Sequence, residues 1–480
     1  MKKFFWFGAV SSALLFATAI VGLSTVSSTS VFADQTLPNT AIPENRDGDK
    51  FRRQVSEMEK GNVDLLWVGD SITDFWDNAG RDVWQKYYVD RGRNPLNFGI
   101  SGDRTSQVIW RIDNAPMDKI APKMAVVMIG TNNLAHGSTP ADTVVGITAI
   151  VDRLGALYPD AKILLLEIFP RGPRPDSKYR DLIEDANARL RAIYGSGQVP
   201  NVQLYSIGDL FLDGEGNLSE EIMPDFLHPG AKGYEIWAEA IEPMVMEGLG
   251  DSPETVQPKR NLAHDDRYTN QCRRLEEKKD FQILMFGDSI VGTWLYPPTP
   301  QHTYVWDKYY GSKGAMNLGV GGDIVSGTAW RFENYPLDGV NPKLIIIEVG
   351  VNDLTSFELP KEDVAFGIRT LVKKMHARWP KARVIAMGCL PFQFAGNPNH
   401  DAMTYQSFVD EYNRVFPLYF RDLPYVTTVD ISDLYLFPDG TYNPQALYDA
   451  VHPTTLGCAL WGERLNPLVE KLLKEYDDEE

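Results

Sequence analysis

The sequence predicts two successive α/β domains, each built around a parallel β-sheet with helices on both faces. Short apolar runs alternate with amphipathic stretches along the chain, as is typical of β-α-β units. The runs at 125–129 and 344–347 are apolar at every position, as strands buried on both faces are. One series of motifs also occurs twice, which indicates a tandem duplication.

The composition is that of a globular protein. The chain has 480 residues, of which 43% are apolar and 23% charged, and this excludes disordered, collagenous and multi-span membrane proteins. Its length allows two or three domains. The net charge of −18 disfavours nucleic acid and anionic lipid surfaces as partners.

The first 33 residues predict a signal peptide. Two lysines precede an apolar run at 4–23, and a Ser/Thr-rich stretch then ends in Val31-Phe32-Ala33, which fits a signal-peptidase site before Asp34. The run is long for a signal core, so an uncleaved anchor is the alternative. Both readings predict export, to the periplasm, the medium or the cell surface.

The repeated motifs divide the rest of the chain. The second copy follows the first at an offset that drifts only from 218 to 224 residues. We expect a tether at 34–49, one domain at 50–249, a Pro- and Asp-containing linker at 250–264 and another domain at 265–476. The expected strands are at 65–68, 96–98, 124–129, 163–168 and 202–205, and at 281–286, 316–318, 344–348, 384–387 and 425–429.

Each copy carries the residues of a serine hydrolase. The first strand ends in Gly-Asp-Ser, which places Ser71 or Ser289 at the start of a helix. A serine hydroxyl needs a base, and a late Asp-x-x-His motif supplies one. The base is His228 or His452, and the acid three residues earlier, Asp225 or Asp449, orients it.

Two further positions in each copy predict donors for an oxyanion. Gly102 and Gly322 offer backbone N–H groups without a side chain in the way, and Asn132 and Asn352 offer side-chain amides. Such preorganised donors stabilise the transition state of acyl transfer by about 3 kcal/mol each.

Taken in order, these four motifs resemble the signature of the GDSL/SGNH hydrolases. The segments 97–105, 110–111, 129–133 and 169–172 are similar to the branch of the platelet-activating-factor acetylhydrolase catalytic subunits. The resemblance implies a three-layer α/β/α, flavodoxin-like fold with about five parallel strands per domain. It also implies a metal-free esterase for short acyl groups, and the roles given above for the serines, histidines, aspartates, glycines and asparagines.

The two copies differ around the predicted site. The first reads Asn133 and Pro-Arg-Gly at 170–172, whereas the second reads Asp353 and Leu390-Pro-Phe-Gln-Phe. Ile324-Val325 also replaces Arg104-Thr105. These changes fall in loops expected to line the substrate pockets, so we expect the second copy to keep the chemistry and change the substrate.

No metal or other cofactor is predicted. Cys272, Cys389 and Cys458 lack the paired spacing of a zinc site and are expected as free thiols, with a single bridge as the alternative. The histidines outside the Asp-x-x-His motifs also lack metal-ligand spacing.

The sequence thus predicts an exported serine esterase that removes acetyl or other short acyl groups, with a small acylated molecule or acetylated glycan as partner. A lipid acetyl ester is the alternative substrate. A chain with one catalytic and one non-catalytic, glycan-binding copy is the alternative architecture. Because the resembled catalytic subunits pair, the two copies are also expected to form an internal pseudo-dimer.

Overall fold

The computed structural model describes residues 37–261, 265–295, 299–392 and 402–479. The predicted signal peptide, residues 1–33, lies outside the described residues. None of the helices within the described ranges combines the length and the apolar character that a membrane span requires.

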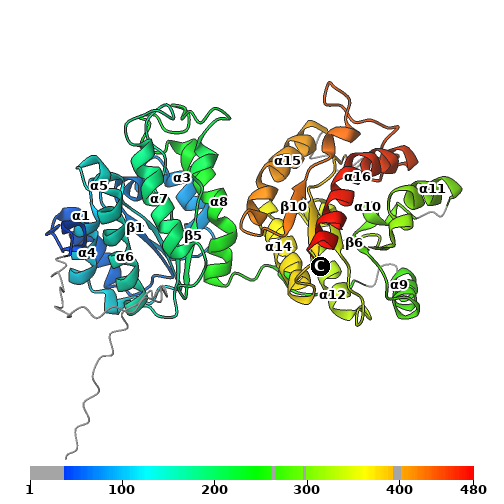
Figure 1. Ribbon diagram of the computed structural model, residues 1–480, viewed down its shortest axis with the longest axis horizontal. Coiled ribbons are helices and arrows are strands. Elements are labelled where there is room, and N and C mark those ends of the chain that lie inside the picture. The colour runs from blue at the N-terminus through cyan, green and yellow to red at the C-terminus, as the bar shows by residue number, and fades with distance from the viewer. Residues whose placement is uncertain (1–36, 262–264, 296–298, 393–401, 480) are drawn as a thin grey trace, which may run out of the picture. The chain divides into compact units, whose positions relative to one another are not determined.

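Two five-stranded parallel sheets form the centres of two domains, as the sequence predicts (Figure 1). The strand order is β2-β1-β3-β4-β5 in the first domain and, read from the opposite edge, the equivalent β7-β6-β8-β9-β10 in the second. The strands are β1 Leu65–Gly69, β2 Pro95–Gly99, β3 Met124–Met128, β4 Lys162–Leu166 and β5 Val202–Tyr205, then β6 Ile283–Gly287, β7 Ala315–Gly319, β8 Leu344–Glu348, β9 Arg383–Met387 and β10 Val426–Val429.

Helices alternate with these strands in both domains. Those of the first domain are α1 Asp49–Met58, α2 Ser71–Asp74, α3 Arg81–Trp84, α4 Thr105–Asn114, α5 Thr131–Ala135, α6 Pro140–Leu157, α7 Arg180–Tyr194 and α8 Ala231–Leu249. Those of the second are α9 Asp265–Glu277, α10 Ser289–Gly292, α11 Pro300–Tyr309, α12 Val325–Asn334, α13 Val351–Thr355, α14 Lys361–Arg378, α15 Ala402–Val415 and α16 Thr455–Asp478.

Alternate side chains of β1 enter two separate cores of the first domain. Leu66 and Val68 pack with residues of α1, α4, α6 and α7. Leu65 and Trp67 pack with residues of α2 and α8 on the other face. Successive side chains of a strand point to opposite faces, so this division places the sheet between two helical layers.

A short arm precedes each domain and packs against it. The 3₁₀ helix η1 (Asn39–Ala41) places the Thr40 hydroxyl 2.5 Å from the Asp142 carbonyl oxygen at the start of α6. In the second domain, η6 (Glu254–Val256) places the Thr255 hydroxyl 2.6 Å from the Asp363 carbonyl oxygen in α14. Parts of the segments expected as tether and linker therefore carry buried threonines that contact their own domains.

Candidate active site

Both serines follow the first strand of their domain at a sharp turn. Asp70 caps α2 by accepting a hydrogen bond from the Ile72 N–H at 3.0 Å, and Asp288 does the same for Ile290 at 2.8 Å. A Cβ at Gly69 would collide with the side chain of Thr73 and the backbone of Met128. The glycine therefore lets strand and helix approach closely, and the serine stands at the first helical position.

The structure brings together the serine, histidine and aspartate of each domain. Ser71 Oγ lies 2.8 Å from His228 Nε2, and His228 Nδ1 lies 2.6 Å from Asp225 Oδ2. The corresponding distances for Ser289, His452 and Asp449 are both 2.7 Å. These are hydrogen-bond distances, so each domain holds one continuous serine–imidazole–carboxylate chain.

A matched turn fixes each aspartate beside its histidine. Asp225 Oδ1 accepts the His228 backbone N–H at 2.7 Å, and Asp449 Oδ1 accepts that of His452 at 2.8 Å. The next residues, Phe226 and Ala450, have φ of 57° and 64°, a conformation that costs energy for residues with a side chain. The same strained turn is thus kept in both domains.

Hydrogen bonding also sets the charge of the aspartates. Partial burial acts to raise the pKa of Asp225, but hydrogen bonds from the His228 backbone and ring outweigh it, and the pKa is lowered. The pKa of Asp449 is lowered in the same way, because hydrogen bonds from the His452 backbone and ring outweigh the effect of burial. Both carboxyl groups are therefore ionised at neutral pH, as the partner of a histidine base must be.

The predicted oxyanion donors lie in two loops that contact each other. Asn132 Nδ2 donates to the Asp103 carbonyl oxygen at 3.0 Å, next to Gly102, and Asn352 Nδ2 donates to that of Asp323 at 2.7 Å. An amide nitrogen carries two N–H donors, so one remains for a substrate. Gly102 has a φ of 84°, and nothing lies within 4 Å of where its Cβ would be. The structure therefore leaves open space beside this backbone.

Two buried arginines, whose role the sequence did not reveal, hold in place the loops that contain Gly102 and Gly322, called the glycine loops below. Arg111 Nε lies 2.8 Å from Asp103 Oδ2, and its Nη1 donates to the Phe98 carbonyl oxygen at 2.7 Å. Arg331 pairs with Asp323 at 3.0 Å in the second domain. The repeated Trp-Arg motif was the signal that could have identified them. In each copy its arginine follows the aspartate of the Gly-Asp pair by eight residues.

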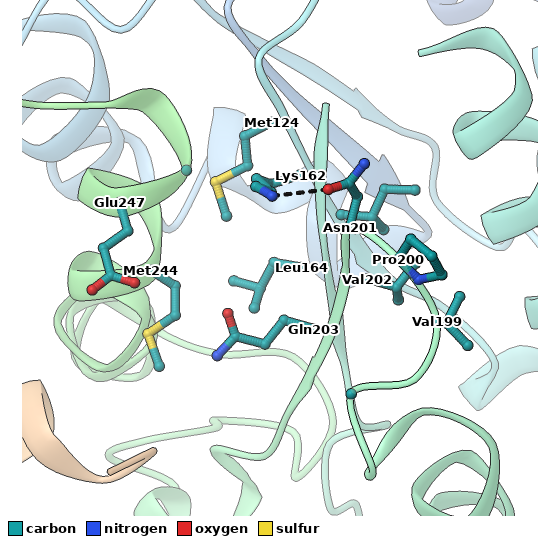
Figure 2. A pocket seen from close by; sticks show the side chains of 13 residues that line it. Met124, Lys162, Leu164, Val199, Pro200, Asn201, Val202, Gln203, Met244 and Glu247 are labelled. Atoms are coloured by element: carbon teal, nitrogen blue, oxygen red, sulfur yellow. Dashed lines mark hydrogen bonds between the residues drawn. The ribbon is translucent and has the colours of Figure 1, made fainter. Parts of the chain in front are cut away.

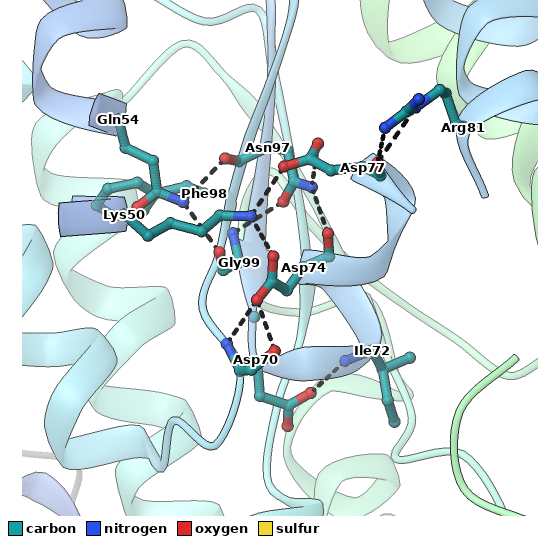
Figure 3. A network of polar contacts seen from close by, with 12 residues as sticks. Lys50, Gln54, Asp70, Ile72, Asp74, Asp77, Arg81, Asn97, Phe98 and Gly99 are labelled. Atoms are coloured by element: carbon teal, nitrogen blue, oxygen red, sulfur yellow. Dashed lines mark hydrogen bonds and ion pairs between the residues drawn. The ribbon is translucent and has the colours of Figure 1, made fainter. Parts of the chain in front are cut away.

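The first domain adds a polar network beneath its glycine loop (Figure 3). Lys50 forms ion pairs with Asp74 and Asp77. Asp74 Oδ2 accepts the backbone N–H of Ser101 at 2.8 Å and its hydroxyl at 2.6 Å. Ser101 directly precedes Gly102, so this network fixes the loop that carries the predicted donor.

The second domain instead has an extra acid behind its serine. Glu348 ends β8 beside Gly287, where the first domain has Met128 beside Gly69. Its side chain is buried and its Oε2 has no hydrogen-bond partner. Burial, and then the charge of Asp288, raise the pKa of Glu348 well above its ordinary value. Burial also raises the pKa of Asp288 to about 8, and that of Asp70 in the first domain to about 7.

The residue that follows the predicted oxyanion asparagine is Asn133 in the first domain and Asp353 in the second, and the two make different hydrogen bonds. In the first domain, Asn133 accepts the Thr105 N–H at 3.0 Å and donates to the Thr105 hydroxyl at 2.8 Å. In the second, Asp353 accepts the Val325 N–H at 3.0 Å, and valine has no hydroxyl to bind. Burial raises the pKa of Asp353 to about 7.

A pocket of about 350 Å³ lies at the amino ends of the strands of the first sheet (Figure 2). Met124, Lys162 and Val202, the first residues of β3, β4 and β5, line it. Ser71 follows the other end of its strand, and sites in parallel sheets lie at the carboxyl ends of the strands. This pocket is therefore separate from the serine and histidine.

The described residues include no cluster of three or more His, Cys, Asp or Glu side chains that could hold a metal. The three cysteines are present as free thiols, with Cys389 and Cys458 buried.

Comparison with known proteins places these features in a family. The model of the GDSL-like Lipase/Acylhydrolase family matches residues 67–236 and 285–460. The alpha2 subunit of platelet-activating factor acetylhydrolase IB is 31% identical over 207 residues in Gallus gallus, covering 43% of this chain and 86% of the relative. The Homo sapiens subunit is 32% identical over 210 residues, covering 43% and 87%.

Solved structures also match single domains. A putative acylhydrolase from Bacteroides fragilis is 19% identical with a TM-score of 0.37, covering 43% of this chain and all of that one. A carbohydrate esterase family 3 protein from Talaromyces cellulolyticus is 18% identical with a TM-score of 0.30, covering 40% and 100%. The family match spans most of the chain, once per domain. The chain belongs to the GDSL-like lipase/acylhydrolase family and is a carboxylic ester hydrolase with two tandem family domains.

Proposed function

We propose that the protein is an exported serine esterase that hydrolyses acetyl and other short-chain acyl esters on carbohydrate, with a Ser-His-Asp triad in each domain. The observation that carries this proposal is the pair of equivalent hydrogen-bonded chains, Ser71–His228–Asp225 and Ser289–His452–Asp449. Export rests on the sequence of residues 1–33 alone.

The first step is attack by the serine hydroxyl on the ester carbonyl carbon. His228 Nε2 takes the proton of Ser71, and Asp225 holds the ring so that Nε2 faces the serine. The Gly102 N–H and the second Asn132 amide N–H stabilise the negative oxygen of the tetrahedral intermediate. Its collapse breaks the ester bond, and the imidazolium returns the proton to the departing alcohol.

Water completes the cycle. His228 removes a proton from water, which attacks the acyl-serine and forms a second tetrahedral intermediate on the same donors. Breakdown of this intermediate releases the carboxylic acid, and the proton returns to Ser71. The second domain carries out the same steps with Ser289, His452, Gly322 and Asn352.

Two considerations support the choice of substrate. The curated relatives are named acetylhydrolases, which favours a small acyl group. Export and a net charge of −18 favour a soluble or wall-bound carbohydrate over an anionic lipid surface. The relatives' names equally favour a lipid acetyl ester, which is the second candidate.

The test is hydrolysis of 4-nitrophenyl acetate by the wild type, Ser71→Ala, Ser289→Ala and the double variant. Loss of the serine of a triad costs several orders of magnitude in turnover at that site. We expect each single variant to keep part of the rate and the double variant to lose it. Undiminished hydrolysis by the double variant would refute the mechanism.

The same four proteins distinguish the substrate candidates. Acetate release is measured from acetylated xylan and from a glycerophospholipid with an acetyl ester. Serine-dependent release from the glycan supports the proposal, and release from the lipid alone supports the second candidate. A rate lost entirely in Ser71→Ala on every substrate would identify the second domain as the non-catalytic one.

A further inference from the structure

One arginine beside the first site has no counterpart in the second. Arg171 follows β4 and donates from Nη1 to the Thr131 hydroxyl at 3.2 Å. Thr131 directly precedes Asn132, one of the proposed oxyanion donors. The neighbouring Gly172 N–H donates to the Phe226 carbonyl oxygen at 2.8 Å, in the turn between Asp225 and His228. Arg171 therefore lies in a loop joined to both halves of the proposed catalytic centre.

The backbone of this loop is held in place independently of the Arg171 side chain. Arg180 donates from Nε and Nη2 to the carbonyl oxygens of Arg171 and Gly172, each at 3.0 Å. Asn187 bonds to both the N–H and the carbonyl oxygen of Ile168, at 2.9 and 3.0 Å. The Arg171 guanidinium lies over the Tyr179 ring, 4.4 Å from its centre.

The charge of Arg171 is not neutralised within the described residues. No carboxylate of the described chain forms an ion pair with it, and its Nε and Nη2 make no hydrogen bond there. Burial lowers the pKa of Arg171, with Tyr179, Asp225 and Asp70 close enough to act against that effect. By contrast, the buried Arg93 and Arg111 both have acid partners. A half-buried guanidinium whose Nε and Nη2 are unused is suited to bind two oxygens of a carboxylate or a phosphate.

The second domain replaces the cation and its partner together. Phe392 stands in the position of Arg171 and Val351 in that of Thr131, and both are buried. The supporting asparagine is unchanged, because Asn413 bonds to the Cys389 N–H and carbonyl oxygen at 2.8 and 2.9 Å. An asparagine therefore holds the start of the loop in both domains. The position that follows differs, because it carries the cationic Arg171 in the first domain and the apolar Phe392 in the second.

We propose that Arg171 binds an oxyanion, a carboxylate or a phosphate, on the alcohol portion of the ester at the first site, whereas the second site takes uncharged esters. This inference rests on the proposed function. An acetyl group carries no charge, so the anion must belong to the acyl acceptor. Since the chain as a whole is strongly acidic, an anionic substrate needs such a local cation.

The experiment compares pairs of aryl acetates whose two members differ in one charge. The anionic probes are 3- and 4-acetoxybenzoate, the neutral probes are their methyl esters, and the readout is the ratio of kcat/KM, anionic over neutral. Each site is measured alone, the first in a Ser289→Ala chain and the second in a Ser71→Ala chain. We expect the ratio to be higher at the first site, and to fall there as salt screens the charge.

Substitution of Arg171 then tests the residue itself. Charged hydrogen bonds typically change binding by about tenfold or more, so Arg171→Phe and Arg171→Gln should each lower the ratio by about that factor. Arg174→Gln is the matched control, because it removes an exposed charge from the same loop. An acetoxyphenyl phosphate, run in parallel, shows whether phosphate or carboxylate is preferred.

The outcomes separate this inference from the proposed function. An unchanged ratio in both Arg171 variants, or an equal loss on both esters in Arg171→Gln, would overturn it and leave the esterase mechanism standing. Hydrolysis that persists in the double serine variant would instead refute the proposed function.

Discussion

Replacing Asp225 by asparagine in a Ser289→Ala chain should lower kcat for an acetyl ester by about 10⁴-fold, the loss typical of this change in a serine triad. Asp225 Oδ1 accepts the backbone N–H groups of Leu227 and His228, at 3.1 and 2.7 Å. The amide oxygen of asparagine can keep these bonds, so the turn survives. Its NH₂ group then faces His228 Nδ1, which forces the proton onto Nε2 and leaves no base for Ser71.

The second domain provides the matched experiment. Asp449 accepts from the Val451 and His452 N–H groups in the same way, at 3.1 and 2.8 Å, so Asp449→Asn in a Ser71→Ala chain should show a comparable loss. Asp213→Asn in the first domain and Asp439→Asn in the second serve as controls, because each of these aspartates accepts a backbone N–H in an exposed turn. A loss below about tenfold in either domain would contradict the role assigned to its aspartate.

Replacing Glu348 by methionine should stabilise the second domain at pH 8 and reduce the dependence of its stability on pH. A buried polar atom without a partner costs about 1–3 kcal/mol, which for a domain of this size corresponds to a melting temperature raised on the order of 5 °C. Methionine occupies the equivalent position in the first domain, so the site accommodates it.

The direction of the pH effect follows from the raised pKa values. Burial raises the pKa of Glu348 well above its usual range and that of Asp288 to about 8. Between about pH 4 and 8 the folded domain therefore holds protons that the unfolded chain has lost. The contribution of these two groups to the free energy of unfolding is therefore least unfavourable below about pH 4, and it becomes more unfavourable as the pH rises through the folded-state pKa.

Heat inactivation of the second site, followed in a Ser71→Ala chain at pH 5 and pH 8, checks this prediction. Glu348→Met should narrow the difference between the inactivation rates at the two pH values, and an exposed control in the same domain, Glu463→Met, should leave it unchanged. An equal or larger difference in Glu348→Met would show that the buried glutamate is not its source.

Sequence patterns were sufficient to predict the sheets and the residues around each serine. The buried strands are apolar at nearly every position, and Gly-Asp-Ser directly follows the first of them, so strand and site could be placed together. The hydrogen bond that caps α2 through Asp70 also follows from its place before a helix.

Other features depend on tertiary contacts that no local pattern shows. The segments around Thr40 and Thr255 are polar and contain proline, as linkers do, yet each threonine is buried against a helix. Their shared Thr-x-x-Pro pattern was the available signal. The buried Glu348 ends an apolar strand, where its residue type gives no sign that it lies beside Asp288. Export and pairing of the two domains stay predictions.

The most direct test of two working sites is labelling of the wild-type chain with a serine-reactive fluorophosphonate, followed by peptide mass spectrometry. A serine hydroxyl is unreactive unless a neighbouring base activates it, so only the two site serines should react. We predict two adducts per chain, one on Ser71 and one on Ser289, and each adduct should be lost when the histidine of the same domain is replaced by alanine. Labelling of neither serine would contradict the mechanism, and labelling of one alone would contradict the claim that both domains are esterases.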